Sequence, residues 1–286
     1  MKYAFIRSHR EQFKVTRMCK VLEVSRGGYY EWRKQRPSTR AKHDVLLLDQ
    51  IRRVHYANRQ AYGAVKTWRE LQRQGIECGK HRVARLRRTH GIEALRKRRF
   101  RITVEHHYTA PAAPDLVGQR FSTEAPDRIW VGDMTFIRTR AGFLYLAILL
   151  DLYARRVVGW SMSHKPDVVL ALGALNMALE RRPAAGLVHH TDRGAIYSAR
   201  LYREAMLSRA LRPSMAAKGS AYDNAVAESF FSNLKNELVH HCDFATREHA
   251  RAAIFDYIEL FYNRRRLHQA LGYRTPDEVD RAARCA

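Results

Sequence analysis

Apolar residues change their spacing about a third of the way along the chain. Before residue 105 they recur every three to four positions, which predicts three amphipathic helices at residues 44–57, 64–74 and 80–90. Gly75 and Gly91 directly follow the second and third of these segments, where a glycine commonly ends a helix. Upstream, residues 12–35 predict two short helices around a turn. The first third of the chain is therefore expected to be helical.

Beyond residue 124 the pattern becomes that of strands. Three β-rich runs joined by short turns predict an antiparallel meander at residues 128–137, 142–153 and 156–162. Further elements are expected in the order helix, strand, helix and strand, starting near residues 166, 187, 195 and 211. After a loop at 218–221, a last helix carries Glu228 and runs to about residue 239. Three strands followed by this alternation give an α/β architecture with a mixed sheet. This order is that of the ribonuclease H-like fold.

These changes of pattern divide the chain into five parts. We expect a ribonuclease H-like mixed-sheet core, an all-α helix-turn-helix-like region before it and a helical tail after it. The predicted boundaries are an N-terminal helical segment with a basic linker at 1–42, a trihelical helix-turn-helix-like DNA-binding domain at 43–105, a proline-containing linker at 106–123, the catalytic core at 124–240 and the tail at 241–286.

The net charge of the chain indicates what kind of partner it binds. The 286 residues include 52 Lys and Arg against 28 Asp and Glu, a formal net charge of +24. Residues 1–105 hold 28 basic and 9 acidic residues, or +19, which leaves 24 and 19, or +5, for the remainder. A field of this sign attracts phosphate backbones or anionic membranes, and the absence of a lipid-binding pattern favours nucleic acid. We therefore interpret the first third of the chain as the region that binds a polyanion.

Other features of the sequence bear on location. The four cysteines are far apart and fit neither a disulfide framework nor a zinc finger, as expected for free thiols in a reducing compartment. The longest apolar run, residues 143–150, is too short to span a bilayer. We therefore expect no membrane association and a place in a reducing cytoplasm.

A row of arginines lies on the third predicted helix. Arg82, Arg85 and Arg88 are three residues apart, opposite Val83 and Leu86. Guanidinium groups with this spacing suit a DNA groove and its phosphates, whereas a solvated basic face is the commoner role for a single helix. The basic run that follows favours DNA binding, with two further candidate residues, Lys97 and Arg98.

Three carboxylates stand where the predicted elements can bring them together. Asp133 lies within the first strand, Asp192 directly follows the fourth, and Glu228 lies on a helix after 35 intervening residues. Taken singly, each is more often structural. As a set, carboxylate oxygens are the ligands that Mg²⁺ prefers, and two such ions support phosphodiester chemistry. The sequence therefore predicts metal-dependent phosphoryl transfer on nucleic acid by Asp133, Asp192 and Glu228.

Neighbouring residues leave alternatives open. Lys235 follows Glu228 by two helical turns, so it shares its face and can hold a DNA phosphate. Asp151 competes as a metal ligand, although a role in the turn after the second strand suffices to explain it. His189 and His190 can orient a ligand or contact DNA, and packing at a strand end is at least as common.

At these residues the chain resembles a known family. The motifs that carry the resemblance are WVGDMT at 130–135, HTDRG at 190–194 and YDNAVAESFF at 222–231, with Lys235 and Glu237. They are similar to the DDE integrase core of bacterial insertion-sequence transposases, in the OrfB protein of the "insertion sequence three" family. The family's C-terminal signature is matched by YNRRRLH at 262–268, LGY at 271–273 and TP at 275–276, and its N-terminal region by VSRGGYYEW at 24–32 and YG at 62–63.

The resemblance implies a function. It identifies Asp133, Asp192 and Glu228 as a catalytic triad that binds Mg²⁺ or Mn²⁺, as two ions, and places Lys235 near the transposon end. It implies a transposase that cleaves and then joins DNA strands, a homo-oligomer on transposon ends and target DNA, and an upstream OrfA partner or frameshift fusion. Two alternatives remain: a DDE nuclease or recombinase without strand transfer, and a DNA-binding regulator with an inactive core.

Overall fold

The computed structural model of the protein describes residues 1–34, 38–95, 113–118, 122–182, 186–216 and 224–285. They form two compact units, residues 1–53 and 54–286. Lys97 and Arg98 and most of the expected linker at 106–123 lie outside the described residues.

The first unit is helical. It contains α1 (Lys2–Ser8), α2 (Val15–Val21) and α3 (Arg26–Lys34). The last two are the predicted helices around a turn, whereas α1 was not predicted, because seven residues hold too few apolar positions to show a period. A small core of Ile6, Met18, Cys19 and Tyr29 joins the three helices.

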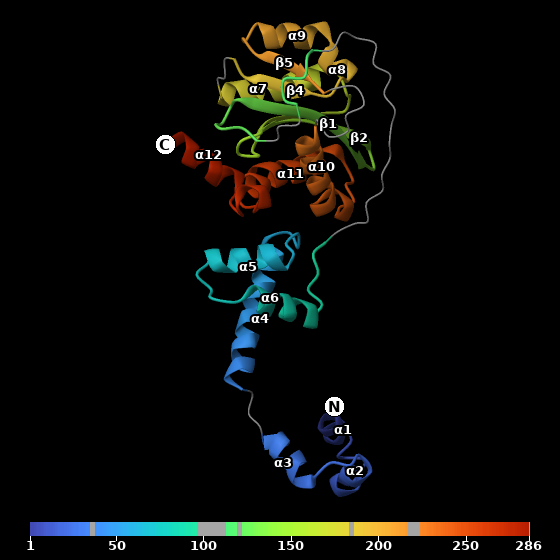
Figure 1. Ribbon diagram of the computed structural model, residues 1–286. Coiled ribbons are helices and arrows are strands. Elements are labelled where there is room, and N and C mark those ends of the chain that lie inside the picture. The colour runs from blue at the N-terminus through green and yellow to red at the C-terminus, as the bar shows by residue number, and fades with distance from the viewer. Residues whose placement is uncertain (35–37, 96–112, 119–121, 183–185, 217–223, 286) are drawn as a thin grey trace. The chain divides into compact units, whose positions relative to one another are not determined.

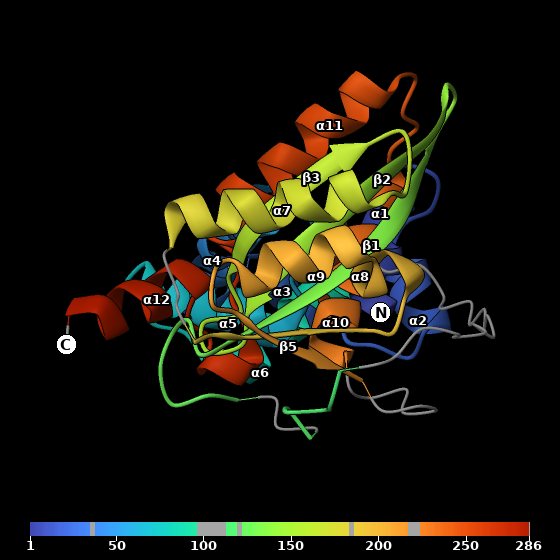
Figure 2. The ribbon, with the colours of Figure 1, turned by 90° about the horizontal axis from the view of Figure 1, so that it is seen from above.

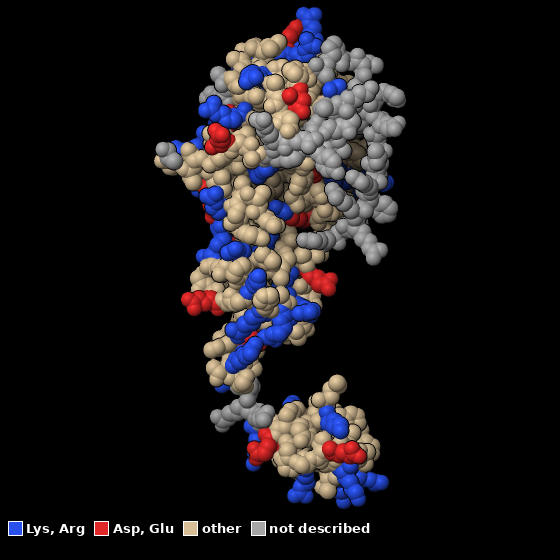
Figure 3. Space-filling view, viewed as in Figure 1, with Lys and Arg blue, Asp and Glu red and all other residues tan. Residues whose placement is uncertain are grey.

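The predicted trihelical segment is α4 (Thr39–Ala57), which crosses the boundary between the units, followed by α5 (Ala64–Arg73) and α6 (Lys80–Thr89). As predicted, Val83 and Leu86 are buried, and Gly75 and Gly91 follow the helices with the positive φ angles of 76° and 62° that glycine adopts readily. Lys and Arg side chains gather on the surface over these helices (Figure 3).

A five-stranded mixed sheet organises the second unit. Its strands, in the spatial order β3-β2-β1-β4-β5, are β1 (Ile129–Thr139), β2 (Gly142–Asp151), β3 (Val157–Ser163), β4 (Val188–Thr191) and β5 (Arg212–Met215). The first three form the predicted antiparallel meander, and β4 and β5 add in parallel to β1. The mixed sheet expected from the sequence is confirmed.

Helices cover both faces of this sheet (Figures 1 and 2). One face carries α7 (Val168–Arg181), α8 (Ala195–Ser198) and α9 (Arg200–Leu207), and the other carries α10 (Ala225–Glu237) and α11 (Arg247–Phe255). The sequence predicts one helix over 195–208, but the chain extends at Ala199 and separates α8 from α9. Gly159 lets α7 lie directly on β3, because a Cβ atom there would come 2.3 Å from the carbonyl oxygen of Ala174.

The tail continues from α11 through the π-helix η2 (Asp256–Tyr262) to the last helix, α12 (Pro276–Cys285), with short 3-10 turns η1 (Val239–His241) and η3 (Gln269–Leu271). Thr275 and Glu278 cap α12 reciprocally: the Glu278 N–H donates to the threonine Oγ1, and the Thr275 N–H donates to the glutamate carboxylate. Within the described residues, no helix has the length and apolar composition needed to cross a bilayer.

Candidate active site

Asp133 lies in the middle of the sheet, on β1. Its carboxylate accepts a hydrogen bond from the Met134 N–H at 2.7 Å. Gly132, one residue earlier, allows a close approach of β4, since a Cβ atom there would lie 2.7 Å from the ring of His189. The glycine therefore lets the two strands meet directly beside the aspartate.

Asp192 follows the end of β4 in a tight loop. The parallel pairing of β1 with β4 ends at Val131 opposite His190, so Asp133 and Asp192 each lie two residues beyond the last pair. The Asp192 carboxylate accepts a hydrogen bond from the Gly194 N–H at 2.9 Å. This register brings the first two predicted carboxylates to one place.

Glu228 approaches from the helix α10, which packs against β1. The side chain of Asn224, at the start of this helix, donates a hydrogen bond to the Gly132 carbonyl at 3.3 Å. That contact fixes the start of α10 beside the residue that precedes Asp133. Glu228 lies in the first turn and is exposed, and among the described residues no hydrogen bond or ion pair holds its side chain.

The electrostatics of Asp133 show that the three carboxylates share one environment. Protein atoms surround its carboxylate closely, and this desolvation, together with the nearby charges of Asp192 and Glu228, raises its pKa to about 8. The Met134 N–H and Lys235 oppose the rise. Burial lowers the pKa of Lys235, and Asp133 partly offsets that effect. The chain therefore concentrates more negative charge here than its own cation neutralises.

Such a cluster suits a hard divalent cation. Carboxylates held close together away from water repel each other, and a bound cation would offset the free-energy cost of this repulsion. Oxygen atoms are also the ligands that Mg²⁺ and Mn²⁺ prefer. Among the described residues, no three His, Cys, Asp or Glu side chains are drawn together tightly enough to hold a metal ion as they stand. The kind of donor and the negative charge of these three residues fit such an ion.

The competing residues have structural roles. Asp151 is fully buried and accepts hydrogen bonds from the N–H groups of Ala154 and Asp127, which fixes the turn after β2. Desolvation is the main cause that raises its pKa to about 6. His189 and His190 are both buried against other side chains, at 2.8 Å from the Tyr202 hydroxyl and 2.9 Å from the Ser214 hydroxyl.

The other end of α10 is anchored by the tail. Arg266 donates to both carboxylate oxygens of Glu237, at 2.6 to 3.1 Å, and the Tyr257 hydroxyl donates to the same carboxylate at 2.8 Å. The side chains of Glu237 and Arg266 are only 9% and 7% exposed. Arg266 also donates to Asn233, one turn before Glu237. Helix α10 is thus held from both directions.

The helical domain reaches the same anchor. The Tyr62 hydroxyl, just before α5, donates to the Arg265 carbonyl at 3.1 Å and accepts from the Leu267 N–H at 2.8 Å. Arg87 of α6 in turn donates to the Tyr62 carbonyl. The Tyr62 hydroxyl therefore binds the main chain of the residues directly before and directly after Arg266.

The predicted basic row on α6 is unevenly exposed. Arg88 is exposed, whereas Arg82 and Arg85 are half-buried. Arg87, which the sequence interpretation passed over, is buried at 4% exposure. The expected row of arginines is therefore only partly exposed to solvent.

Sequence reasoning missed Asn224 and Arg266 as supports of the site. Asn224 carries one local signal, because an asparagine directly before a helical run is a common helix start. Arg266 stands in a run of three arginines, and nothing local distinguishes the buried one from Arg264 and Arg265.

Family models match two stretches of this chain, residues 42–100 and 123–276. The model described as "Integrase core domain" matches residues 123–221 and a second of that description matches 209–276, while "HTH-like domain" matches 42–100. Among solved structures, the integrase catalytic core domain of HTLV-2 in complex with magnesium is 17% identical, covers 55% of this chain and 98% of its own, and has a TM-score of 0.42. The simian T-cell lymphotropic virus intasome is 16% identical, covers 62% and 60%, and has a TM-score of 0.48. These two likenesses are too distant to bear on chemistry.

Two relatives are much more similar. The "Insertion element IS600 uncharacterized 31 kDa protein" of Shigella sonnei is 42% identical over 260 residues, 91% of this chain and 96% of the relative. "Transposase InsF for insertion sequence IS3A" of Escherichia coli (strain K12) is 40% identical over 283 residues, 98% of each chain. With an integrase core of the ribonuclease H-like class and this degree of identity, the chain belongs to the IS3-type insertion-sequence transposases.

Proposed function

We propose that Asp133, Asp192 and Glu228 are the catalytic triad of a DNA transposase, and that the chain both cleaves transposon strands and joins them to new DNA. The observation that carries this proposal is the shared environment of the three carboxylates, in which Asp192 and Glu228 raise the pKa of the desolvated Asp133. In the reaction a water hydrolyses a phosphodiester at the transposon end, and the freed 3′-OH then attacks a second phosphodiester.

The triad would hold Mg²⁺ or Mn²⁺, as two ions. When bound, such ions activate the attacking oxygen, stabilise the leaving oxygen and neutralise charge on the phosphoryl group. The chain's own contribution is placement: β1 fixes Asp133, the loop after β4 fixes Asp192, and Asn224 fixes the start of the helix that carries Glu228. Lys235, close enough to Asp133 to shift its pKa, would hold the DNA phosphate beside the ions.

DNA contacts outside the triad are part of the proposal. Arg82, Arg85 and Arg88, with Lys97 and Arg98 after them, would grip DNA through the helix-turn-helix-like domain, in a homo-oligomer that brings transposon ends and target together. The net charge of +19 on residues 1–105 supports this assignment, and affinity should fall steeply as salt rises. An upstream OrfA protein or frameshift fusion would complete end recognition, and the complex would act on nucleoid DNA in the bacterial cytoplasm.

The test is strand cleavage and joining on a labelled DNA end from the element's own flanks, with Mg²⁺ and with EDTA. We expect Mg²⁺-dependent joining by the wild type, with and without OrfA in parallel reactions, and none by Glu228→Gln. The exposed Glu248→Gln in the first turn of α11 is the matched control and should join normally.

Each alternative predicts a different result. Cleavage without joining would favour a nuclease, and binding without metal-dependent chemistry under all conditions would favour a regulator. Full joining by Glu228→Gln would remove this residue from the triad.

A further inference from the structure

Two exposed phenylalanines face each other across the hairpin of β1 and β2. Phe136 is 56% exposed and Phe143 is 46% exposed, and their ring centroids lie 5.3 Å apart in a T-shaped arrangement. Tyr145 extends the row, with its ring 6.4 Å from that of Phe143. Phe136 is directly opposite Tyr145 in the register, so the three rings share one face of the sheet. We call these three residues the aromatic row.

The aromatic row lies further along the strand that carries Asp133. Phe136 follows Asp133 by three residues, which is about 10 Å, and the regular alternation of β1 directs the two side chains to opposite faces of the sheet. Lys235 spans this gap: its ammonium lies 5.4 Å from the centroid of the Phe136 ring and close enough to Asp133 to shift its pKa. Because β4 pairs with β1 only as far as Val131, a DNA strand whose phosphate lay at Asp133 would reach Phe136 by passing over the edge of β1, along the side chain of Lys235.

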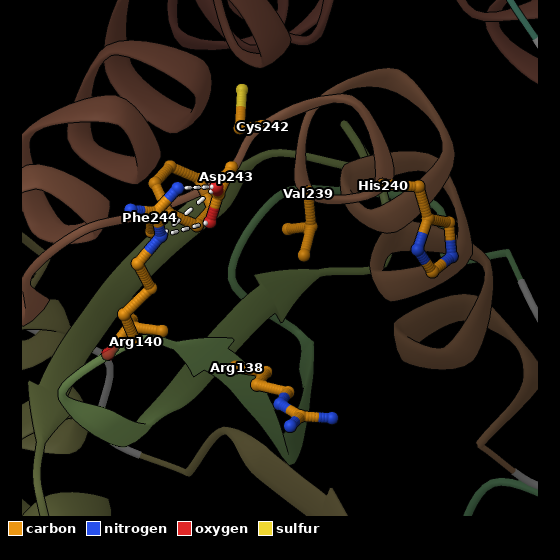
Figure 4. A pocket seen from close by; sticks show the side chains of 8 residues that line it. Arg138, Arg140, Val239, His240, Cys242, Asp243 and Phe244 are labelled. Atoms are coloured by element: carbon orange, nitrogen blue, oxygen red, sulfur yellow. Dashed lines mark hydrogen bonds and ion pairs between the residues drawn. The ribbon is translucent and has the colours of Figure 1, made fainter.

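Positive charge continues beyond the rings. Arg138 is exposed, lies two residues after Phe136 and stands opposite Phe143 in the register. It lines an open pocket of about 520 Å³ with Arg140 and His240. Arg140 is paired with Asp243, whereas the Arg138 side chain points away from that pair, and among the described residues no ion pair of Arg138 is recorded (Figure 4).

Exposed rings interleaved with cations are the surface that binds unpaired nucleotides. Bases stack on the rings, the cations hold the phosphates, and this binding tolerates any sequence because every base has a π-face. We propose that Phe136, backed by Phe143, stacks on an unpaired base next to the reacting phosphate, and that Arg138 holds the following phosphate. The proposal rests on the proposed function, because it takes the reacting phosphate to lie at Asp133.

The experiment places the fluorescent base 2-aminopurine at the nucleotide next to the cleavage site, in the transposon end or in the target strand. Binding is followed with Ca²⁺ in place of Mg²⁺. We expect quenching by the wild type and by Phe136→Tyr, and loss of quenching with Phe136→Leu, which keeps an apolar side chain but removes the ring. In Mg²⁺ the KM of Phe136→Leu for DNA should rise about 5- to 150-fold with kcat little changed. The position of the quenched base identifies which strand stacks.

The matched control is Phe255→Leu. Phe255 is 45% exposed on α11 and contacts Trp160, not the aromatic row. This variant should leave quenching and KM unchanged.

Two outcomes would overturn the proposal. One is unchanged quenching and KM in Phe136→Leu. The other is a Phe136→Leu protein that sediments as a smaller oligomer while quenching normally, which would make the aromatic row an interface between copies of the chain. Failure of the proposed function looks different: the wild type would quench the probe, and so support stacking, yet neither cleave nor join DNA in Mg²⁺.

Discussion

Two glutamates at opposite ends of helix α10 have opposite surroundings. Glu237 is buried and accepts hydrogen bonds from Arg266 and Tyr257, so the chain itself satisfies its charge. Glu228, nine residues earlier, is exposed, and among the described residues its carboxylate has no hydrogen bond or ion pair. A carboxylate whose hydrogen bonds all come from the protein stabilises the fold. A carboxylate that lies near other carboxylates without such partners is available to bind a ligand. One helix therefore carries both a support and a reactive group.

The largest expected effect is a loss of strand joining, and it should occur when Glu228 is replaced but not when Glu237 is. Glu228→Gln should reduce strand joining at least about 10³-fold, because ion-assisted charge stabilisation contributes several kcal/mol to the barrier. Its free energy of unfolding should change by no more than about 0.5 kcal/mol, as for other exposed positions. Joining assays and urea unfolding of the same preparations measure both.

Glu237→Gln should behave in the opposite way, with lower stability and joining per folded molecule within about tenfold of the wild type. A stable Glu237→Gln protein without joining activity would contradict the division of roles.

Breaking the buried ion pair should have the largest effect on stability. Arg266→Met leaves the Glu237 charge buried without its partner and should lower the free energy of unfolding by about 3–5 kcal/mol. Adding Glu237→Leu to that variant should recover most of the loss, because the unpaired charge is then gone. The neighbouring Arg265→Met, at an exposed position, is the control and should unfold as the wild type does. Equal losses in the two single arginine variants would show that Arg266 is no special support.

A smaller effect is expected where the helical domain meets the tail. Tyr62→Phe removes the hydroxyl that accepts from the Leu267 N–H, and a buried N–H without a partner costs about 1–3 kcal/mol. The free energy of unfolding should fall by that amount. Tyr56 is 68% exposed, so Tyr56→Phe should be neutral by the same urea titration. A neutral Tyr62→Phe would mean that water replaces the hydroxyl without cost.

The smallest effect concerns metal. Mg²⁺ at ten times its Kd should raise the free energy of unfolding of the wild type by about 1.4 kcal/mol. Glu228→Gln should lose much of this gain, while Glu237→Gln should keep it from a lower starting stability. Thermal unfolding with Mg²⁺ and with EDTA makes the comparison, and an equal gain in all three proteins would place the ion elsewhere.

Local pattern predicts a residue's element better than its partner. The alternation of apolar residues indicated β1, β2 and β3, as the structure has them. The meeting of Asp133 and Asp192 depended on the first and fourth strands being neighbours, and the parallel pairing of β1 with β4 supplies that condition. The ion pair between Glu237 and Arg266 spans 29 residues. Periodicity carries no information about such a distant pair, since any of three consecutive arginines could have supplied it.

Irregular backbone was also beyond prediction. The apolar pattern of residues 246–261 predicts one continuous helix, but a π-helix replaces the α-helix from Asp256 onward. A π-helix keeps the apolar spacing nearly helical, so the pattern hides it. The exposure of Phe136 was hidden as well, because an aromatic residue in a strand is ordinarily read as part of the core.

Strand β1 has a second neighbour over only part of its length. Its pairing with β4 covers Ile129–Val131, and among the described residues the strand runs on to Thr139 with β2 alone beside it. Asp133 thus lies just past a fork in the sheet, where side chains in place of a neighbouring strand bind the main chain: Asn224 donates to the Gly132 carbonyl, and Asp133 accepts from the Met134 N–H. Any segment that displaced these side-chain contacts and paired with the edge as an extra strand would cover the side of β1 next to Asp133.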